Sequence, residues 1–191
     1  MKFTAMVALA MTGLTAQAAA MKQSQISIYV QNNAHVPVRE LDQAEILAAT
    51  MFASVHIEID WREGQPSAAG EPIAIELAAN VPKTEKPGAL ACAYYDESII
   101  VVFWDRMEHA ANPAPLLAHV LVHEITHILE GVSRHSQSGI MKERWNAADM
   151  DLIQFHKLKL AFAAEDVYLI QLGLKKREAM DRRVPHSVAS E

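Results

Sequence analysis

Residues 123–141 read HEITHILEGVSRHSQSGIM, a short stretch that holds three histidines. His123 and His127 are four residues apart, so on a helix both imidazoles lie on one face, one turn apart, where they can bind one cation. Zinc accepts imidazole nitrogen, and a catalytic zinc site keeps a position open for water. Glu124 projects beside the pair. The stretch therefore predicts a metal site at which Glu124 accepts a proton from water rather than binding the metal.

A third protein ligand is expected downstream of the helix. Gly131 can adopt a left-handed conformation that ends the helix, and His135 follows in the loop, where it can close the site from the other side. His119 also precedes the pair, but it lies about 12 Å from His127 along the axis, too far for one metal on a straight helix. We therefore expect His119 at the surface or behind a ligand. The acids Glu143, Asp149 and Asp151 could each supply a carboxylate ligand from the next helix, and we keep Glu143 as the alternative third ligand.

The first residues differ from the rest of the chain. Residues 1–20 read MKFTAMVALAMTGLTAQAAA, with one early cation, an apolar run too short to span a bilayer, and small residues before a polar continuation. This pattern is typical of a cleaved secretory signal. We expect a secreted or periplasmic protein with no stable membrane anchor, a mature domain over 21–185 and a polar tail over 186–191.

The net charge limits the classes of partner, and the cysteine content limits how the fold is stabilised. The net charge of −6 disfavours a nucleic-acid partner or an anionic membrane surface. Cys92 is the only cysteine, so no disulfide can form within the chain, and an apolar context predicts a small buried residue. We expect a monomer whose core and metal stabilise the fold.

Apolar periodicity predicts an α+β domain. A helix between the first two strands suggests a parallel crossover in a mixed twisted sheet, packed on a central helix that carries the histidines and on C-terminal helices. The expected strands cover 25–31, 56–63, 73–79 and 98–104, with a short strand or irregular edge over 89–95, and the expected helices cover 38–55, 112–130, 146–164 and 165–182.

The pentad HEITH, the later glycine, the pair His135-Ser136 and Met141 resemble the metzincin clan of zinc endopeptidases, with the His-Ser pair most similar to its matrixin-like branch. With GIMKERW after the third histidine, the chain also resembles small secreted bacterial zincin-like proteins. The resemblance implies a zincin-like fold in which His123, His127 and His135 bind Zn²⁺ and Glu124 is the general base. It makes Met141 the Met-turn residue below the metal, and it implies that a strand within 89–103 pairs with an extended peptide substrate.

The spacing departs from that clan. The usual pattern is HExxHxxGxxH, whereas this chain has HExxHxxxGxxxH, with one extra residue on each side of the glycine. The helix should therefore run one residue further, and a wider loop should carry His135.

Other side chains near the motif have weaker signals. Tyr94 and Tyr95 could donate hydrogen bonds to a tetrahedral oxyanion, although such tyrosines more often pack at a sheet edge. Arg134 and Lys142 are predicted to be solvated charges, and Trp145 to belong to the core or the cleft floor. Ile125, Ile128 and Leu129 should face away from the metal into the core.

These patterns together predict a secreted zinc-dependent endopeptidase that acts on a peptide or protein substrate. Two alternatives stay open. One is a catalytically idle, zinc-stabilised module that binds peptides. The other is a zinc amidase that acts on cell-wall peptides. The acid at position 124 favours an enzyme, because a purely structural zinc site has no use for it.

Overall fold

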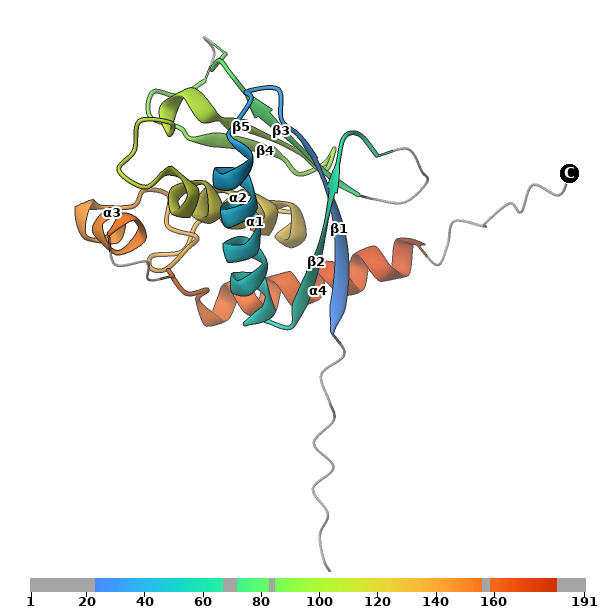
Figure 1. The fold of residues 1–191 in the computed structure, drawn as a ribbon. Coiled ribbons are helices and arrows are strands. Elements are labelled where there is room, and N and C mark those ends of the chain that lie inside the picture. The colour runs from blue at the N-terminus through green and yellow to red at the C-terminus, as the bar shows by residue number, and fades with distance from the viewer. Residues whose placement is uncertain (1–22, 67–71, 83–84, 156–158, 182–191) are drawn as a thin grey trace, which may run out of the picture.

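The computed structural model describes residues 23–66, 72–82, 85–155 and 159–181, and within them a mixed sheet of five strands lies beside a layer of helices (Figure 1). The strand order is β2-β1-β3-β5-β4, in which β4 alone runs antiparallel to its neighbour and lies at the margin. The strands are β1 (Ser24–Gln31), β2 (Ile57–Glu63), β3 (Ile73–Ala78), β4 (Ala91–Tyr94) and β5 (Ile99–Phe103). The predicted signal segment 1–20 and the tail 186–191 lie outside the described residues.

Helix α1 (Val38–Ala53) connects the parallel strands β1 and β2, so the predicted crossover is confirmed. A 3₁₀ turn, η1 (Trp104–Arg106), follows β5 and leads towards the central helix α2 (Pro113–Glu130). Two C-terminal helices follow, α3 (Ala147–Gln154) and α4 (Ala164–Asp181). The predicted α+β class, a mixed sheet packed on helices with a central helix, is confirmed.

The prediction of one helix over 146–164 is wrong in its length. Helix α3 begins after a capping box, in which Asn146 and Asp149 each bond to the other's backbone N–H, and it ends at Gln154. Residues 159–163 carry no regular structure, and their backbone serves other elements. The N–H of Leu160 donates to His119, and the carbonyl of Ala161 accepts from the N–H of Ile140 at 2.9 Å. These contacts with distant residues replace the hydrogen bonds of a helix.

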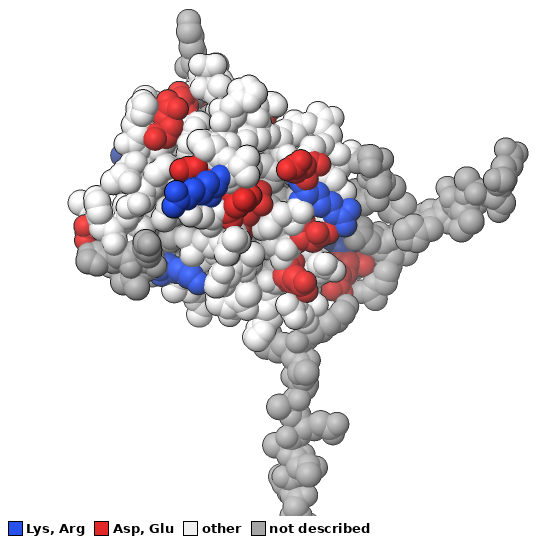
Figure 2. All heavy atoms as spheres, viewed as in Figure 1, with Lys and Arg blue, Asp and Glu red and all other residues white. Residues whose placement is uncertain are grey.

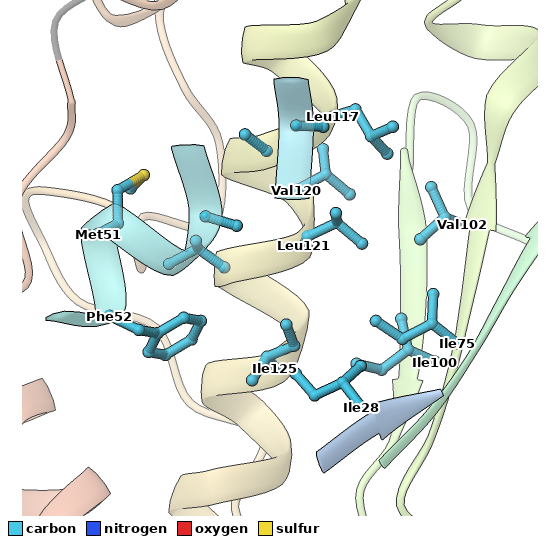
Figure 3. Packing of buried hydrophobic residues seen from close by; sticks show 14 of the residues in the cluster. Ile28, Met51, Phe52, Ile75, Ile100, Val102, Leu117, Val120, Leu121 and Ile125 are labelled. Carbon is cyan, nitrogen blue, oxygen red and sulfur yellow. The ribbon is translucent and has the colours of Figure 1, made fainter. Parts of the chain in front are cut away.

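The core lies between the sheet and the paired helices α1 and α2 (Figure 3). Alternate strand residues point towards the helices, as the two-residue period of a strand requires. Helix α2 is apolar nearly all round because it packs on the sheet, on α1 and on α4. Ile125, Ile128 and Leu129 are buried in this core, as predicted. Sheet and helix residues that meet here include Ile28, Ile75, Ile100, Leu117, Leu121 and Ile125.

The surface carries interspersed charges of both signs on the face shown in Figure 2. No helix within the described residues is long and apolar enough to cross a membrane.

Candidate metal centre

The last two turns of α2 present the histidine pair. Pro113 stands at the start of this helix, where its missing N–H and fixed φ are tolerated. The helix ends at Glu130, and Gly131 follows in the left-handed region with φ 68°. The N–H of Gly131 donates to the carbonyl of His127 at 2.9 Å. The helix thus runs as far as the longer spacing predicts, and then turns towards His135.

Three histidines converge at this turn. The ligand nitrogens of His123, His127 and His135 all lie within 4.8 Å of one another. The ring of His135 has its centroid 5.3 Å from that of His123 and 5.0 Å from that of His127. Glu143, the alternative ligand, is not part of the group that the described residues form. The loop histidine therefore completes a three-nitrogen group with the helical pair.

The helical imidazoles are held in one tautomer. Nδ1 of His123 lies 2.9 Å from the carbonyl oxygen of Ile140, and Nδ1 of His127 lies 3.3 Å from that of Val132. Because a carbonyl oxygen only accepts hydrogen bonds, both Nδ1 atoms carry the proton and both Nε2 atoms present lone pairs. Burial lowers the pKa of His123 to about 4, and burial with the neighbouring imidazoles lowers that of His127 to about 4. Both rings are therefore neutral at pH 7.

The distance between the two Nε2 atoms is 3.1 Å. Two lone pairs at this separation repel unless a cation lies between them. Tetrahedral zinc with bonds of about 2.0–2.1 Å holds its nitrogen ligands about 3.3 Å apart. Outer carbonyls that orient imidazole ligands are also usual at zinc sites. The donor set and its spacing fit Zn²⁺.

Glu124 follows the first histidine on the same helix. Burial raises its pKa to about 8, so without a cation the carboxyl holds its proton at neutral pH. A positive charge among the three imidazoles favours the carboxylate and lowers this pKa. A metal would therefore prepare Glu124 to act as a base.

Two residues after the third histidine, Met141 and Trp145, lie against the site. Met141 is fully buried, and its carbonyl accepts from the N–H of Ser136 at 2.7 Å. The indole of Trp145 stands edge-on to His123 with centroids 5.9 Å apart, and its N–H donates at 3.2 Å to the Ile140 carbonyl that also holds His123. Trp145 is thus half-buried beside the centre, which agrees with the predicted core or cleft-floor position.

His119 is not a surface residue, and that part of the prediction is wrong. The residue is 1% exposed. Nδ1 donates to the Pro115 carbonyl at 2.7 Å, and Nε2 accepts from the N–H of Leu160 at 3.3 Å. The ring stands edge-on to Trp145 with centroids 6.1 Å apart, so it lies behind the residue that contacts His123. The contact with Leu160 forms across a long sequence separation, which no local pattern reveals.

Arg134 and Lys142 are not solvated charges, contrary to the prediction. The side chain of Arg134 is 22% exposed and bonds to Asp166 at 2.9 Å, and that of Lys142 is 19% exposed and pairs with Asp149. Asp149 is therefore engaged away from the histidines. Sequence reasoning missed Asp166 altogether, because an acid in the first turn of a helix is ordinary.

Neither Tyr94 nor Tyr95 makes a hydrogen bond or ring contact with the three histidines among the described residues. Tyr94 pairs with the exposed Ile99 on β5. The next residue of β5, Ile100, is buried and faces the helices, so Ile99 and Tyr94 lie on the opposite face. Tyr94 therefore points to the open face of the sheet. Cys92 shares that face and is half-buried, less than the predicted buried residue.

No protein-family model matches this chain, and no curated protein matches it in sequence. Solved structures do resemble it. Archaemetzincin from Methanopyrus kandleri aligns with a TM-score of 0.55 at 14% identity, over 79% of this chain and 96% of that one. A zinc-dependent peptidase from Methanocorpusculum labreanum aligns with a TM-score of 0.53 at 11% identity, over 75% and 99%. Metalloproteinase-II from Bacteroides fragilis gives 0.51 at 10% identity, over 82% of this chain and 55% of that one.

At these identities the likeness concerns the fold. The chain has a zincin-like metallopeptidase fold, and the three histidines lie together on its central helix and the following loop.

Proposed function

We propose that this protein is a zinc-dependent peptidase in which His123, His127 and His135 bind the metal and Glu124 is the general base. One observation carries the proposal. Two buried, neutral imidazoles direct unprotonated Nε2 atoms at each other across 3.1 Å, and a third imidazole converges on them from the next loop. An acid stands beside this group on the same helix. The zinc peptidases of similar fold support the same class of reaction.

The chemistry divides between the metal and the chain. Zinc, when bound, supplies a Lewis acid that acidifies water and polarises a peptide carbonyl. Glu124 accepts the proton of the attacking water and then delivers it to the amine that leaves. The Nδ1 protons of His123 and His127 stay on backbone carbonyls, which leaves both Nε2 lone pairs free to bind the metal. Burial lowers the pKa of all three imidazoles, which favours the neutral form that a metal needs.

The edge strand β4 supports an endopeptidase rather than an enzyme restricted to chain ends. It packs against α2 and has β5 on one side only within the described residues. Its other edge offers backbone N–H and C=O groups to an extended peptide. A peptide added there can continue past both ends of the four-residue strand. Because Tyr94 faces the open side of the sheet, we do not assign it to the oxyanion.

Export is part of the proposal and rests on residues 1–20. Removal of this segment as a signal peptide would leave a mature metzincin-type peptidase domain over 21–185. N-terminal sequencing of the protein recovered from outside the cytoplasm tests this, and the expected first residue lies between Ala19 and Met21. Recovery of the intact Met1 terminus in the cytoplasm would contradict it.

The decisive experiment joins metal analysis of the purified protein to cleavage of a diverse peptide library with and without chelator. Glu124→Gln should retain one zinc per chain, whereas its hydrolysis should fall by about 10²–10⁴, the usual contribution of a general base. Glu143→Gln is the matched control and should retain both zinc and turnover. Zinc binding without any hydrolysis by the wild type would instead support the idle peptide-binding module.

The third ligand has its own test. His135→Ala should lower zinc affinity far more than Glu143→Ala, because only His135 belongs to the converging group. If Glu143→Ala causes the larger loss, the assignment of His135 is wrong.

A further inference from the structure

His135 is held differently from the other two histidines. The rings of His123 and His127 each donate to a backbone carbonyl, and both residues lie on a buried helix. Among the described residues the ring of His135 has contacts with the other two rings but no hydrogen bond, and the residue is exposed in a loop. Its orientation therefore depends on the chain on either side of it.

Both neighbours of His135 bind the same carboxylate oxygen. Nη2 of Arg134 donates to Oδ1 of Asp166 at 2.9 Å, and the hydroxyl of Ser136 donates to that same oxygen. Arg134 Nη1 also donates to the Ser136 hydroxyl at 3.0 Å, so the three side chains close a ring of contacts. One oxygen of α4 thus fixes the residue before the ligand and the residue after it.

Asp166 is itself immobilised. Its side chain is 0% exposed, and its second oxygen accepts at 2.8 Å from the N–H of Ala163, the residue just before α4, as an acid at the third position of a helix does in a capping box. A carboxylate that is buried, capped and charge-paired has little freedom to move. It is a rigid point to which a loop can attach.

Arg134 also reaches back to the end of α2. Its Nε lies 3.7 Å from Oε2 of Glu130, whose side chain is 0% exposed. Burial raises the pKa of Glu130 to about 7, while the guanidinium lowers it. Neither Glu130 oxygen has a hydrogen-bond donor among the described residues, so the positive charge of Arg134 is its main compensation. Arg134 therefore joins the end of the histidine helix to the start of α4.

The longer spacing between His127 and His135 explains why the third ligand needs this network. The loop from Gly131 to His135 has one residue more than the usual metzincin pattern, and a longer loop holds its ligand less firmly. Glu130 is the last residue of α2 and stands where the usual pattern has its glycine. Arg134 directly precedes the ligand His135. The extra residues thus lie within the segment that the ion pairs restrain.

We propose that Asp166 is a positioning residue for the third metal ligand, acting through Arg134 and Ser136, so that helix α4 sets the affinity of the centre for zinc. The inference rests on the proposed metal site and adds a residue to it. Asp166 does not touch the metal or the substrate.

The test measures zinc dissociation constants by competition with a chromophoric chelator. Asp166→Asn should weaken zinc binding by about 10–100-fold, the usual effect of a residue that orients a ligand. Glu165→Gln is the matched control, because Glu165 also pairs with Arg134 at 3.3 Å but is 72% exposed, and its affinity should stay within about threefold of wild type.

Ser136→Ala is the second variant, in case Asp166→Asn fails to fold. It removes one of the two donors to Oδ1 and should weaken zinc binding in the same direction, with less effect on the fold. Co²⁺ absorption of each variant provides a readout that a loss of stability alone does not change, because a displaced His135 alters the ligand geometry.

The outcomes separate this inference from the proposed function. If wild type binds zinc and both Asp166→Asn and Ser136→Ala bind it equally well with unchanged Co²⁺ spectra, the positioning role is wrong and the metal site stands. If wild type binds no zinc, the proposed function fails, and this inference fails with it. Weaker binding in the folded variants, with Glu165→Gln unchanged, supports the positioning role.

Discussion

Replacing Gly173 by alanine should destabilise this protein, although the same change at an exposed helical position normally stabilises one. Gly173 lies in α4 where that helix packs against the end of α2. An added Cβ would lie 1.7 Å from the carbonyl oxygen of Leu129 and 2.8 Å from its carbon. Real Cβ atoms essentially never approach within 3.0 Å, so the two helices must separate by at least 1.3 Å, the difference between 3.0 and 1.7 Å.

Two opposing free energies decide the sign. Alanine is favoured over glycine within a helix by about 1 kcal/mol. Overpacking of a buried contact costs about 1–3 kcal/mol, and the upper part of this range applies because backbone on both sides cannot turn away as a side chain can. The free energy of unfolding should therefore fall by up to about 2 kcal/mol, the difference between these two effects.

Urea unfolding of the metal-free protein measures this, with Lys175 as the matched position. Lys175 is exposed on the same helix, so Lys175→Ala should be more stable than Lys175→Gly by about 1 kcal/mol. At position 173 the order should reverse, with glycine the more stable and the denaturant slope unchanged. If Gly173→Ala is as stable as wild type or more so, the close approach of α4 to α2 is wrong.

Three further results are expected. Gly131→Ala should lower the free energy of unfolding by about 1–2 kcal/mol, and Gly131→Asn should lower it by less. The left-handed backbone with φ 68° is the only obstacle to alanine, because no atom lies within 4 Å of the added Cβ. Equal losses for the two variants in urea melts would contradict this. Asn146→Ala should cost about 1 kcal/mol because it removes the cap on the N–H of Asp149, and an unchanged urea midpoint would refute the cap. In the metal-free protein the lowered pKa values of His123 and His127 mean that these two imidazoles bind fewer protons in the folded state than in the unfolded state between pH 4 and 6.5, so their contribution to stability is lost as the pH falls through this window. The loss should reach the order of 3 kcal/mol per imidazole and be smaller in His127→Gln, which urea melts at pH 6.5 and 4 can compare.

Prediction from sequence succeeded where the determining pattern is local. The helical period placed the central helix, and Gly131 ended it, because helical propensity and a left-handed cap depend on residues within one or two turns. The crossover between β1 and β2 followed from a helix between two strands. The C-terminal helices were less well predicted, since the apolar spacing of 146–164 resembles one helix whereas Leu160 and Ala161 bond to α2 and to the Met141 loop.

The local pattern also could not reveal which charges are buried. Arg134 beside a ligand looks solvated in sequence, and Asp166 looks like an ordinary acid at a helix start. Their contact spans thirty-two positions and exists only because α4 packs across the end of α2. The burial of His119 is equally non-local, because the N–H of Leu160, forty-one positions away, donates to its Nε2.

The amino-acid sequence by itself determined which side chains could bind a metal, because a four-residue separation on a helix places two imidazoles on one face, with the acid beside them, whatever surrounds them. Only the tertiary structure decided how the third imidazole is held, which tautomer the helical pair adopts and which charges are removed from water. These depend on carbonyls and carboxylates that approach from other elements, and the distances between such groups arise from packing rather than from neighbouring positions in the chain.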